Sequence, residues 1–484
     1  MDIRKTVVSG IKWSSISNIG LAILQLIQIS ILTRYLPKED FGLLAIAVFS
    51  VNFTNIFVEM GISTAILFKQ NITQKQYSSL YWLNNFIAII LYIFIYTASP
   101  LVAQFYNQPK VENIIRILAF NIILMAIGQQ HRVILQKKLI FHTLAKVDLI
   151  AYTVGLITAV TMAISGYGVY SLVFSTISTS AISSSLLIYI RRKQEPILLH
   201  FKMSEIRDFL TIGTYSLGSN ILDFLSREID LILIGKYFGP RTLGIYSLAK
   251  QISLKLYSVV IPIVFSVFNP LLASMNREKK KVEYYYLKVL HMISHTTIPF
   301  YLIVALCSRE ILTILYGKEY ETAYYILACL AIFQACFTLV KPAGSLQIAT
   351  GRTDVGFIWT IIRNVLTVTV LLFVIKSENI DAVATSLAVL SCGFLFLMYR
   401  LQIKRMTKIT FRTYLQQFLS PLLLLVTITT LNLFWIDGYT ISNNIFISLI
   451  IKIMTGLITY FAVLFMIGEL KIIKIKALFR NENR

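Results

Sequence analysis

Polar side chains recur at helical spacing within one apolar stretch of the chain, namely Asn220, Asp223, Arg227 and Asp230, with Glu228 beside them. Intervals of three and four residues bring side chains to one face of a helix, so Arg227 can touch both aspartates. An ionisable group in the middle of a membrane costs at least about 2.5 kcal/mol, so it usually faces a cavity or a charged partner. Two interpretations stay open: Asp223, Glu228 and Asp230 bind a coupling proton or sodium ion, or the cluster neutralises itself and fixes the helix in its bundle.

A second set of candidates is basic, and its members lie within or beside apolar stretches. They are Arg227, Lys250, Lys255, Lys341, Arg352 and Arg363. A guanidinium or ammonium group in a medium of low dielectric constant is suited to holding a pyrophosphate, so this set predicts the binding of an anionic lipid-linked substrate. Alternatively, Arg352 only marks the cytoplasmic end of a span, and the lysines extend their ammonium groups to the membrane surface. The run Lys341-Pro342-Ala343-Gly344 predicts a break in its helix, which fits either a binding site or a packing kink.

The elements that must position these residues are membrane-spanning helices. Hydrophobic residues make up 56% of the 484 residues and charged residues only 14%, which excludes an ordinary soluble domain. About fourteen apolar segments have the roughly 20 residues that a helix needs to cross a bilayer, and the backbone must be paired inside it, so the predicted fold class is all-α. The predicted spans are residues 12–35, 41–64, 78–100, 113–134, 144–165, 168–190, 209–235, 241–270, 286–315, 322–349, 355–375, 381–401, 414–436 and 443–468.

Basic residues are distributed unevenly over the loops. Near the span ends, about 30 Lys and Arg fall on the side of the N-terminus and about 8 on the other side, which predicts that both termini are cytoplasmic. The formal net charge of +22 is mostly explained by this asymmetry. Because the basic residues lie in separate loops rather than on one domain, the charge argues against nucleic acid as a partner. The clearest cases are Arg191, Arg192, Lys193, Arg277, Lys279, Lys280, Lys281, Arg400, Lys404, Arg405 and Lys408.

The sequence contains an internal repeat. An offset of 202 residues aligns Trp13, Ser14, Ser17, Asn18, Tyr35, Phe41 and Gly42 with Tyr215, Ser216, Ser219, Asn220, Tyr237, Leu243 and Gly244. Each copy holds six spans in the same orientation, which predicts two parallel lobes related by an axis along the membrane normal. The predicted domains are an N-terminal lobe (1–200), a C-terminal lobe (201–405), and a segment (406–484) with two extra helices and a basic cytoplasmic tail. A chance match between two apolar regions is the alternative.

Other kinds of site are disfavoured. The sequence has no phosphate-binding glycine loop, no nucleophile motif and no acid–base pair in a soluble loop, so no catalytic residue and no cofactor are predicted. His291 and His295 stand one helical turn apart without a third ligand nearby, so no metal site is predicted. The four cysteines lack the spacing of a disulfide framework or a zinc site and are predicted to fill the core.

A series of motifs follows one order along the chain. In the first lobe they are Gly61-Ile62-Ser63-Thr64-Ala65, Thr73, Gln76, Trp82, Asn84, Arg132, Leu135-Gln136-Lys137, Phe141, Gly166-Tyr167-Gly168 and Leu172-Val173. In the second lobe they are Arg227, Asp230, Ile234-Gly235, Gly239, Leu243-Gly244, Tyr246, Ala249, Phe268, Pro270, Ser274, Tyr316-Gly317, Gly351-Arg352 and Asp354. In this order the chain resembles the Wzx-type polysaccharide flippases of the multidrug/oligosaccharidyl-lipid/polysaccharide superfamily, in the branch of the colanic-acid and teichuronic-acid exporters.

The resemblance implies a MATE-like fold in the bacterial inner membrane and a transport function. The expected activity is flipping of undecaprenyl-pyrophosphate-linked oligosaccharides to the periplasmic leaflet by alternating access, coupled to a proton or sodium gradient and connected to the polysaccharide polymerase machinery. The family commonly carries Asn where this chain has Glu228, so the local charge balance departs from its pattern. A multidrug or cation antiporter and a peptidoglycan-precursor flippase are the alternatives. A membrane polysaccharide polymerase is disfavoured because the loops between the spans are short.

Overall fold

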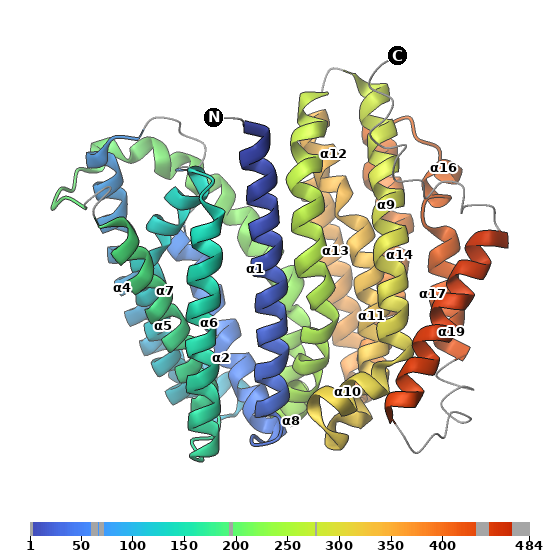
Figure 1. The fold of residues 1–484 in the computed structure, drawn as a ribbon, viewed down its shortest axis with the longest axis horizontal. Helices are drawn as coiled ribbons and strands as arrows, with labels where there is room; N and C mark the ends of the chain where they lie inside the picture. The colour runs from blue at the N-terminus through green and yellow to red at the C-terminus, as the bar shows by residue number, and fades with distance from the viewer. Residues whose placement is uncertain are drawn as a thin grey trace. The chain divides into compact units, whose positions relative to one another are not determined.

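The computed structural model describes residues 3–59, 66, 72–192, 197–275, 278–431 and 445–466, which contain helices and no β-strand. Four features from the sequence lie outside these residues: the 61–65 motif, Lys193, Arg277 and the predicted tail after residue 466. The helices, shown in Figure 1, are α1 (Ile3–Leu32), α2 (Lys38–Glu59), α4 (Gln74–Tyr106), α5 (Pro109–Lys137), α6 (Phe141–Ile164), α7 (Tyr170–Arg191), η1 (Met203–Glu205), α8 (Arg207–Ser274), α9 (Lys279–Leu306), α10 (Ser308–Tyr316), η2 (Lys318–Ala323), α11 (Tyr324–Val340), α12 (Pro342–Thr350), α13 (Thr353–Val374), η3 (Ile375–Ser377), α14 (Ile380–Met398), η4 (Tyr399–Ile403), α15 (Lys404–Met406), α16 (Phe411–Leu415), α17 (Leu419–Leu431) and α19 (Ile445–Met466).

The length and composition of these helices confirm an all-α membrane protein. In the described part of the chain, ten helices are long and apolar enough to cross a membrane. Two shorter apolar helices, Leu419–Thr430 and Ile445–Tyr460, cover the last two predicted spans in part. The total of fourteen spans stays a prediction.

Two breaks in the helices have a local cause in the sequence. The predicted spans 209–235 and 241–270 both fall in α8, where Gly239 interrupts the helical backbone with φ 78° and ψ 177°. Glycine adopts a positive φ without the steric cost that a side chain brings, so the kink lies between the two predicted spans. The second break lies at Lys341, where α11 ends at Val340 and α12 begins at Pro342. Proline is tolerated at the start of a helix but not in its interior, as the sequence predicts at this position.

The chain divides into two compact units. The first consists of Met1–Leu248 and Thr360–Ile380, and the second of Ala249–Trp359 and Asp381–Arg484. The predicted lobes 1–200 and 201–405 and the segment 406–484 stay a prediction.

In the first unit, α6 packs against α1 and α7, and α5 packs against α4, α7 and α2. Glycines allow the close approaches to α7. A β-carbon at Gly128 of α5 would overlap the Ser184 hydroxyl, and one at Gly155 of α6 would overlap the Thr179 hydroxyl. Small residues at helix contacts let backbones approach in a membrane, where packing rather than the hydrophobic effect drives association. The bundle α1, α5, α6 and α7 is thereby held tightly around the cavity described below.

In the second unit, α9 is the central helix and packs against α11, α12, α17 and α19. Ser294 of α9 donates its hydroxyl to the Gln417 carbonyl oxygen at 2.7 Å. Gly456 of α19 faces Leu306 at the end of α9, where a β-carbon would come within 2.7 Å of the leucine side chain. All four cysteines belong to this unit, and none of them forms a disulfide. Cys307, Cys329 and Cys336 are buried, as expected of residues that fill the core.

Candidate functional site

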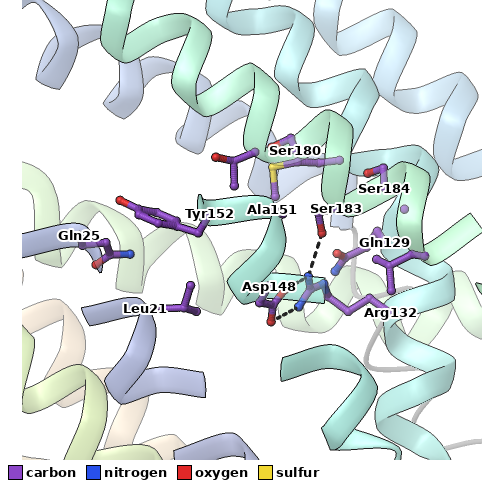
Figure 2. A pocket seen from close by; sticks show the side chains of 14 residues that line it. Leu21, Gln25, Gln129, Arg132, Asp148, Ala151, Tyr152, Ser180, Ser183 and Ser184 are labelled. Atoms are coloured by element: carbon purple, nitrogen blue, oxygen red, sulfur yellow. Dashed lines mark hydrogen bonds and ion pairs between the residues drawn. The ribbon is translucent and has the colours of Figure 1, made fainter. Parts of the chain in front are cut away.

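The first unit contains a cavity of about 420 Å³ that is lined by both polar and apolar residues. Its wall comes from α1, α5, α6 and α7, and ionisable, amide and hydroxyl side chains stand among a few apolar ones (Figure 2). The lining residues are Leu21, Gln25, Met125, Gly128, Gln129, Arg132, Asp148, Ala151, Tyr152, Thr179, Ser180, Ser183, Ser184 and Leu187. Pockets of about 300–1,000 Å³ are typical of small-molecule sites, and polar side chains inside a membrane usually face such a space.

An ion pair between Arg132 of α5 and Asp148 of α6 lies at the wall of this cavity. Figure 2 shows the two side chains pointing toward each other. Arg132 Nη1 donates to Asp148 Oδ2 at 3.1 Å, while Nη2 donates both to Asp148 Oδ1 and, at 3.2 Å, to the hydroxyl of Ser183 on α7. The side chains of Arg132 and Asp148 keep 27% and 21% of their surface exposed, so a ligand in the cavity can reach them. A bidentate pair of this kind joins three helices at one point.

A second polar network supports the wall behind Tyr152. The Tyr152 hydroxyl donates to Gln28 Oε1, and Gln28 Nε2 donates to the Ser175 hydroxyl at 2.9 Å. Ser175 in turn donates to the Gly155 carbonyl oxygen at 2.8 Å. This series of hydrogen bonds connects α1, α6 and α7. The cavity therefore offers fixed hydroxyl and amide groups beside a charge-balanced ion pair, an arrangement that suits neutral groups rich in hydroxyls.

The predicted cluster on α8 is also in the first unit. Asp223 and Arg227 are exposed, Glu228 is half-buried and Asp230 is buried. Arg227 Nε donates to the main-chain oxygen of Asp223 at 3.3 Å. Asp230 Oδ2 accepts from the Tyr246 hydroxyl at 2.6 Å, and its Oδ1 accepts from the Leu231 amide at 2.9 Å. Tyr246 follows the kink at Gly239, so Asp230 joins the two arms of α8.

The predicted basic residues divide between the two units, and their environments differ. Arg227 and the half-buried Arg363 belong to the first unit, and the rest belong to the second. The ammonium group of Lys341 lies 4.7 Å from the centre of the Phe337 ring and 5.8 Å from that of Tyr257, in cation–π contact. Lys250 and Lys255 are half-buried on α8. Substrate binding by this set stays a prediction.

Arg352 lies between α12 and α13, and its charge has an acidic neighbour. Its Nε donates to Asp354 Oδ1 at 3.0 Å, and its Nη2 donates to Oδ2 at 3.1 Å. The two side chains are 48% and 59% exposed. The position and the exposure of Arg352 are compatible with both interpretations of this residue, so its role stays a prediction.

The second unit holds a buried ion pair between α10 and α19. Lys452 Nζ lies 2.9 Å from Glu310 Oε1, and the side chains are only 2% and 5% exposed. Ser448, one turn before the lysine on α19, donates its hydroxyl to the same carboxylate oxygen at 2.7 Å. Among the residues that the structure describes, no group of three or more His, Cys, Asp or Glu side chains could hold a metal ion.

A family model described as "Polysaccharide biosynthesis protein" matches residues 31–325. The chain belongs to this family. It is 29% identical over 426 residues to the teichuronic acid biosynthesis protein TuaB of Bacillus subtilis (strain 168), covering 87% of both chains. It is 23% identical over 423 residues to the lipopolysaccharide biosynthesis protein WzxC of Escherichia coli (strain K12), covering 87% of this chain and 86% of that protein.

A solved structure shares the fold. The lipid II flippase MurJ, in an inward closed conformation, superposes with a TM-score of 0.74 and 16% identity, covering 94% of this chain and 99% of MurJ. At this identity the likeness shows the fold alone. Together with the family and the apolar helices, it confirms the predicted transporter fold and the resemblance to the Wzx-type exporters. The protein is a multi-pass membrane protein of a bacterial polysaccharide family.

Sequence reasoning missed two ion pairs that join helices inside the predicted spans, Arg132 with Asp148 and Glu310 with Lys452, although the position of each residue within an apolar span was a usable signal. Arg132 and Asp148 fall within the predicted spans 113–134 and 144–165, and Arg132 was noted only as part of a family motif. Glu310 and Lys452 likewise fall within predicted spans. Each of these four residues is the single charged residue on its face of the helix. The α8 cluster, by contrast, is recognised from the spacing of several charged residues along one helix. A pair formed between helices has no such periodicity, so only its position inside a span points to it.

Proposed function

We propose that the protein flips oligosaccharides linked to undecaprenyl pyrophosphate from the cytoplasmic to the periplasmic leaflet, by alternating access, for the synthesis of a surface polysaccharide. The observation that carries this proposal is the cavity with charged, amide and hydroxyl side chains around Arg132 and Asp148, in a chain that belongs to a polysaccharide biosynthesis family. Hydroxyl and amide groups at fixed positions match the hydroxyls of a sugar, and alternating access moves such a group past the hydrocarbon core. The names of TuaB and WzxC support the same role.

Other parts of the molecule receive roles in this scheme. The basic set of Arg227, Lys250, Lys255, Lys341, Arg352 and Arg363 holds the pyrophosphate, and Asp223, Glu228 and Asp230 couple the cycle to a proton or sodium gradient. The excess of Lys and Arg on the N-terminal side supports cytoplasmic termini in the bacterial inner membrane. The protein acts as a transporter rather than an enzyme, and it delivers its product to the polymerase machinery on the periplasmic side.

The test is transport of a fluorophore-labelled undecaprenyl pyrophosphate oligosaccharide in proteoliposomes, followed by a membrane-impermeant quencher. Arg132→Gln removes the charge-assisted hydrogen bonds to Asp148 and Ser183. Such bonds are worth about 1.5–3 kcal/mol each, so we expect transport to fall at least about tenfold. Arg227→Ala and Asp230→Ala are tested in the same assay.

Arg116→Gln is the matched control. Arg116 lies on the same helix, α5, and also pairs with an acidic residue, Glu112, at 2.7 Å, but neither lines the cavity. We expect this variant to transport at close to the native rate. If the labelled lipid stays in its leaflet while a cationic dye is exchanged for protons, the protein is an antiporter and not a flippase. Transport of a peptidoglycan precursor in place of the oligosaccharide would favour the other flippase.

A further inference from the structure

The beginning of α2 crosses α8 just after its kink, and the two backbones touch. Gly42 and Gly244 stand at the crossing. A β-carbon on Gly42 would overlap the Pro240 carbonyl oxygen, and one on Gly244 would overlap the Lys38 carbonyl oxygen. A β-carbon on Gly244 would also come within 3.1 Å of the Gly42 amide nitrogen. Each glycine therefore faces main-chain atoms, which cannot move aside as a flexible side chain can.

The crossing obeys the symmetry of the internal repeat. With the offset of 202 residues, Lys38 corresponds to Pro240 and Gly42 to Gly244. The contact of Gly244 with Lys38 is therefore the repeat image of the contact of Gly42 with Pro240. Two residues that correspond to each other in the two copies of the repeat are called mates here. In a twofold arrangement, if residue i contacts residue j, the mate of j contacts the mate of i. The paired contacts indicate that the axis relating the repeats passes through this point.

An ion pair beside the crossing obeys the same symmetry. Glu39 corresponds to Arg241, and these two mates pair directly, with Arg241 Nε 3.6 Å from Glu39 Oε1. A residue can contact its own mate only at the axis. The side chains are 44% and 71% exposed, and an exposed pair of this kind contributes little, about 0–1 kcal/mol. The crossing is therefore tightly fitted but held by a weak bond, which suits a contact that breaks repeatedly.

The crossing lies at one end of the spans. α1 begins at Ile3 and ends at Leu32, and α2 begins at Lys38, so the crossing is at the end of α1 away from the start of the chain (Figure 1). Further along α2, side chains make the contact with α8. The rings of Phe49 and Phe224 stack there with their centroids 5.4 Å apart. The backbone contact at Gly42 and Gly244 therefore lies toward the face opposite the N-terminus.

We propose that this crossing is a gate, closed in this structure, that must separate before the transport path opens to the side opposite the N-terminus. The proposal rests on the alternating-access function above. The bodies that move in this proposal are the two predicted copies of the repeat rather than the two compact units, and these copies open one face by parting at their common axis on that face. Glycines allow the backbones to meet without a gap, so the closed gate excludes water. The ion pair of Glu39 and Arg241 sets the register of the closed state and releases at low cost.

The first test locks the crossing. In the variant E39C/R241C, a short bifunctional methanethiosulfonate bridges the two cysteines, and a reductant removes the bridge. We expect the bridge to lower transport of the labelled undecaprenyl pyrophosphate oligosaccharide at least about tenfold, because the state open to that face is no longer populated, and we expect the reductant to restore it. The native chain receives the same treatment as a control for its own four cysteines.

The matched control is E112C/R116C. This pair has the same charges, but both residues lie on α5 at an interval of four residues, so a bridge between them restrains no second helix. It should leave transport unchanged. Unchanged transport by the bridged E39C/R241C protein would overturn the gate. Failure of that variant to bridge at all would also overturn it, because the two side chains would then not meet.

A second measurement does not depend on the transported molecule. Spin labels at positions 39 and 241 report the distance between α2 and α8 in liposomes, and the gate predicts a short and a long population. Gly42→Leu should shift the distribution to the long population, whereas Gly218→Leu should not, because nothing lies within 4 Å of a β-carbon at Gly218. The gate would be refuted if the spin labels report one short distance only and Gly42→Leu leaves this distance unchanged. Absence of transport in the native chain itself would refute the flippase function and leave this distance test standing.

Discussion

At the scale of single residues, the buried pair of Glu310 and Lys452 places two charges where water does not reach. Lys452→Met would leave a carboxylate buried with only Ser448 to stabilise it, and breaking such a pair typically costs about 3–5 kcal/mol. Replacing both partners removes the uncompensated charge. We therefore expect Lys452→Met to lower the midpoint of thermal unfolding strongly, and the double variant E310Q/K452M to recover most of the loss.

The control for this prediction is the neighbouring pair of Arg309 and Glu321. Its side chains are 46% and 24% exposed, so Arg309→Gln should cost only about 0–1 kcal/mol. Equal shifts for Lys452→Met and Arg309→Gln, measured by thermal unfolding in detergent, would contradict the argument from burial.

The bond between Tyr246 and Asp230 discriminates between the two interpretations of the α8 cluster. Tyr246→Phe removes the 2.6 Å donor from a buried carboxylate, and a hydrogen bond to a charged group contributes about 1.5–3 kcal/mol. We expect a lower unfolding midpoint, with Tyr237→Phe as an exposed control on the same helix. If Asp230 only fixes the helix, the variant's transport keeps its native dependence on the ion gradient. A changed dependence would show that Asp230 takes part in coupling.

At the scale of elements, the packing of α5 on α7 depends on the missing side chain of Gly128. A β-carbon there would overlap the Ser184 hydroxyl and come within 2.9 Å of the Ser184 α-carbon, so Gly128→Ala must push the helices apart. Overpacking of this kind costs about 1–3 kcal/mol and here also distorts the cavity wall. We expect lower stability and lower transport together.

Gly393→Ala is the matched substitution on α14. Nothing lies within 4 Å of a β-carbon at this position, so alanine should be neutral or slightly stabilising, because it reduces the freedom of the unfolded chain. Thermal unfolding of the two variants side by side checks the prediction. A destabilisation by Gly393→Ala as large as that by Gly128→Ala would contradict the argument from contact, because helix propensity favours alanine over glycine at both positions.

Elements were the part of this molecule that could be predicted best from the sequence. Apolar runs of about 20 residues report membrane helices directly, and the break at Lys341 and Pro342 follows from the missing amide hydrogen of proline. The kink at Gly239 was harder to foresee. A gap of only five residues separates the predicted spans 209–235 and 241–270, and whether such a gap forms a loop or a kinked helix depends on the packing around it.

Side-chain partners were much harder to predict. Spacing along one helix identified Asp223, Arg227 and Asp230, yet Asp230 accepts a hydrogen bond from the side chain of Tyr246, on the far side of the kink. The partners of Arg132 and Lys452 come from other helices, and the sequence of one chain contains no distance between helices. The crossing of Gly42 and Gly244 is an intermediate case: the repeat aligned the two residues, but only the coordinates show that the mates meet.

At the scale of the whole molecule, the arrangement of helix ends predicts which loops face each side of the membrane. α4 ends at Tyr106 and α5 begins at Pro109, so the loop at Asn107 lies at the opposite end of these spans from the loop that follows α7. The excess of Lys and Arg predicts that the latter loop faces the cytoplasm. It contains Leu199, which is 94% exposed and accessible to a reagent when replaced by cysteine.

We therefore expect Asn107→Cys to react with a membrane-impermeant maleimide added to intact cells, and Leu199→Cys to react only after the membrane is permeabilised. The native chain is the background control, since its own cysteines are largely buried. Asn107 adopts a left-handed backbone with φ 54°, so Gln108→Cys provides a second site in the same loop without that constraint. The reverse pattern of labelling would invert the topology, and the gate at Gly42 and Gly244 would then face the cytoplasm. A flippase that loads its substrate in the cytoplasmic leaflet would in that case open first at this crossing, so labelling decides which half of the transport cycle the closed gate represents.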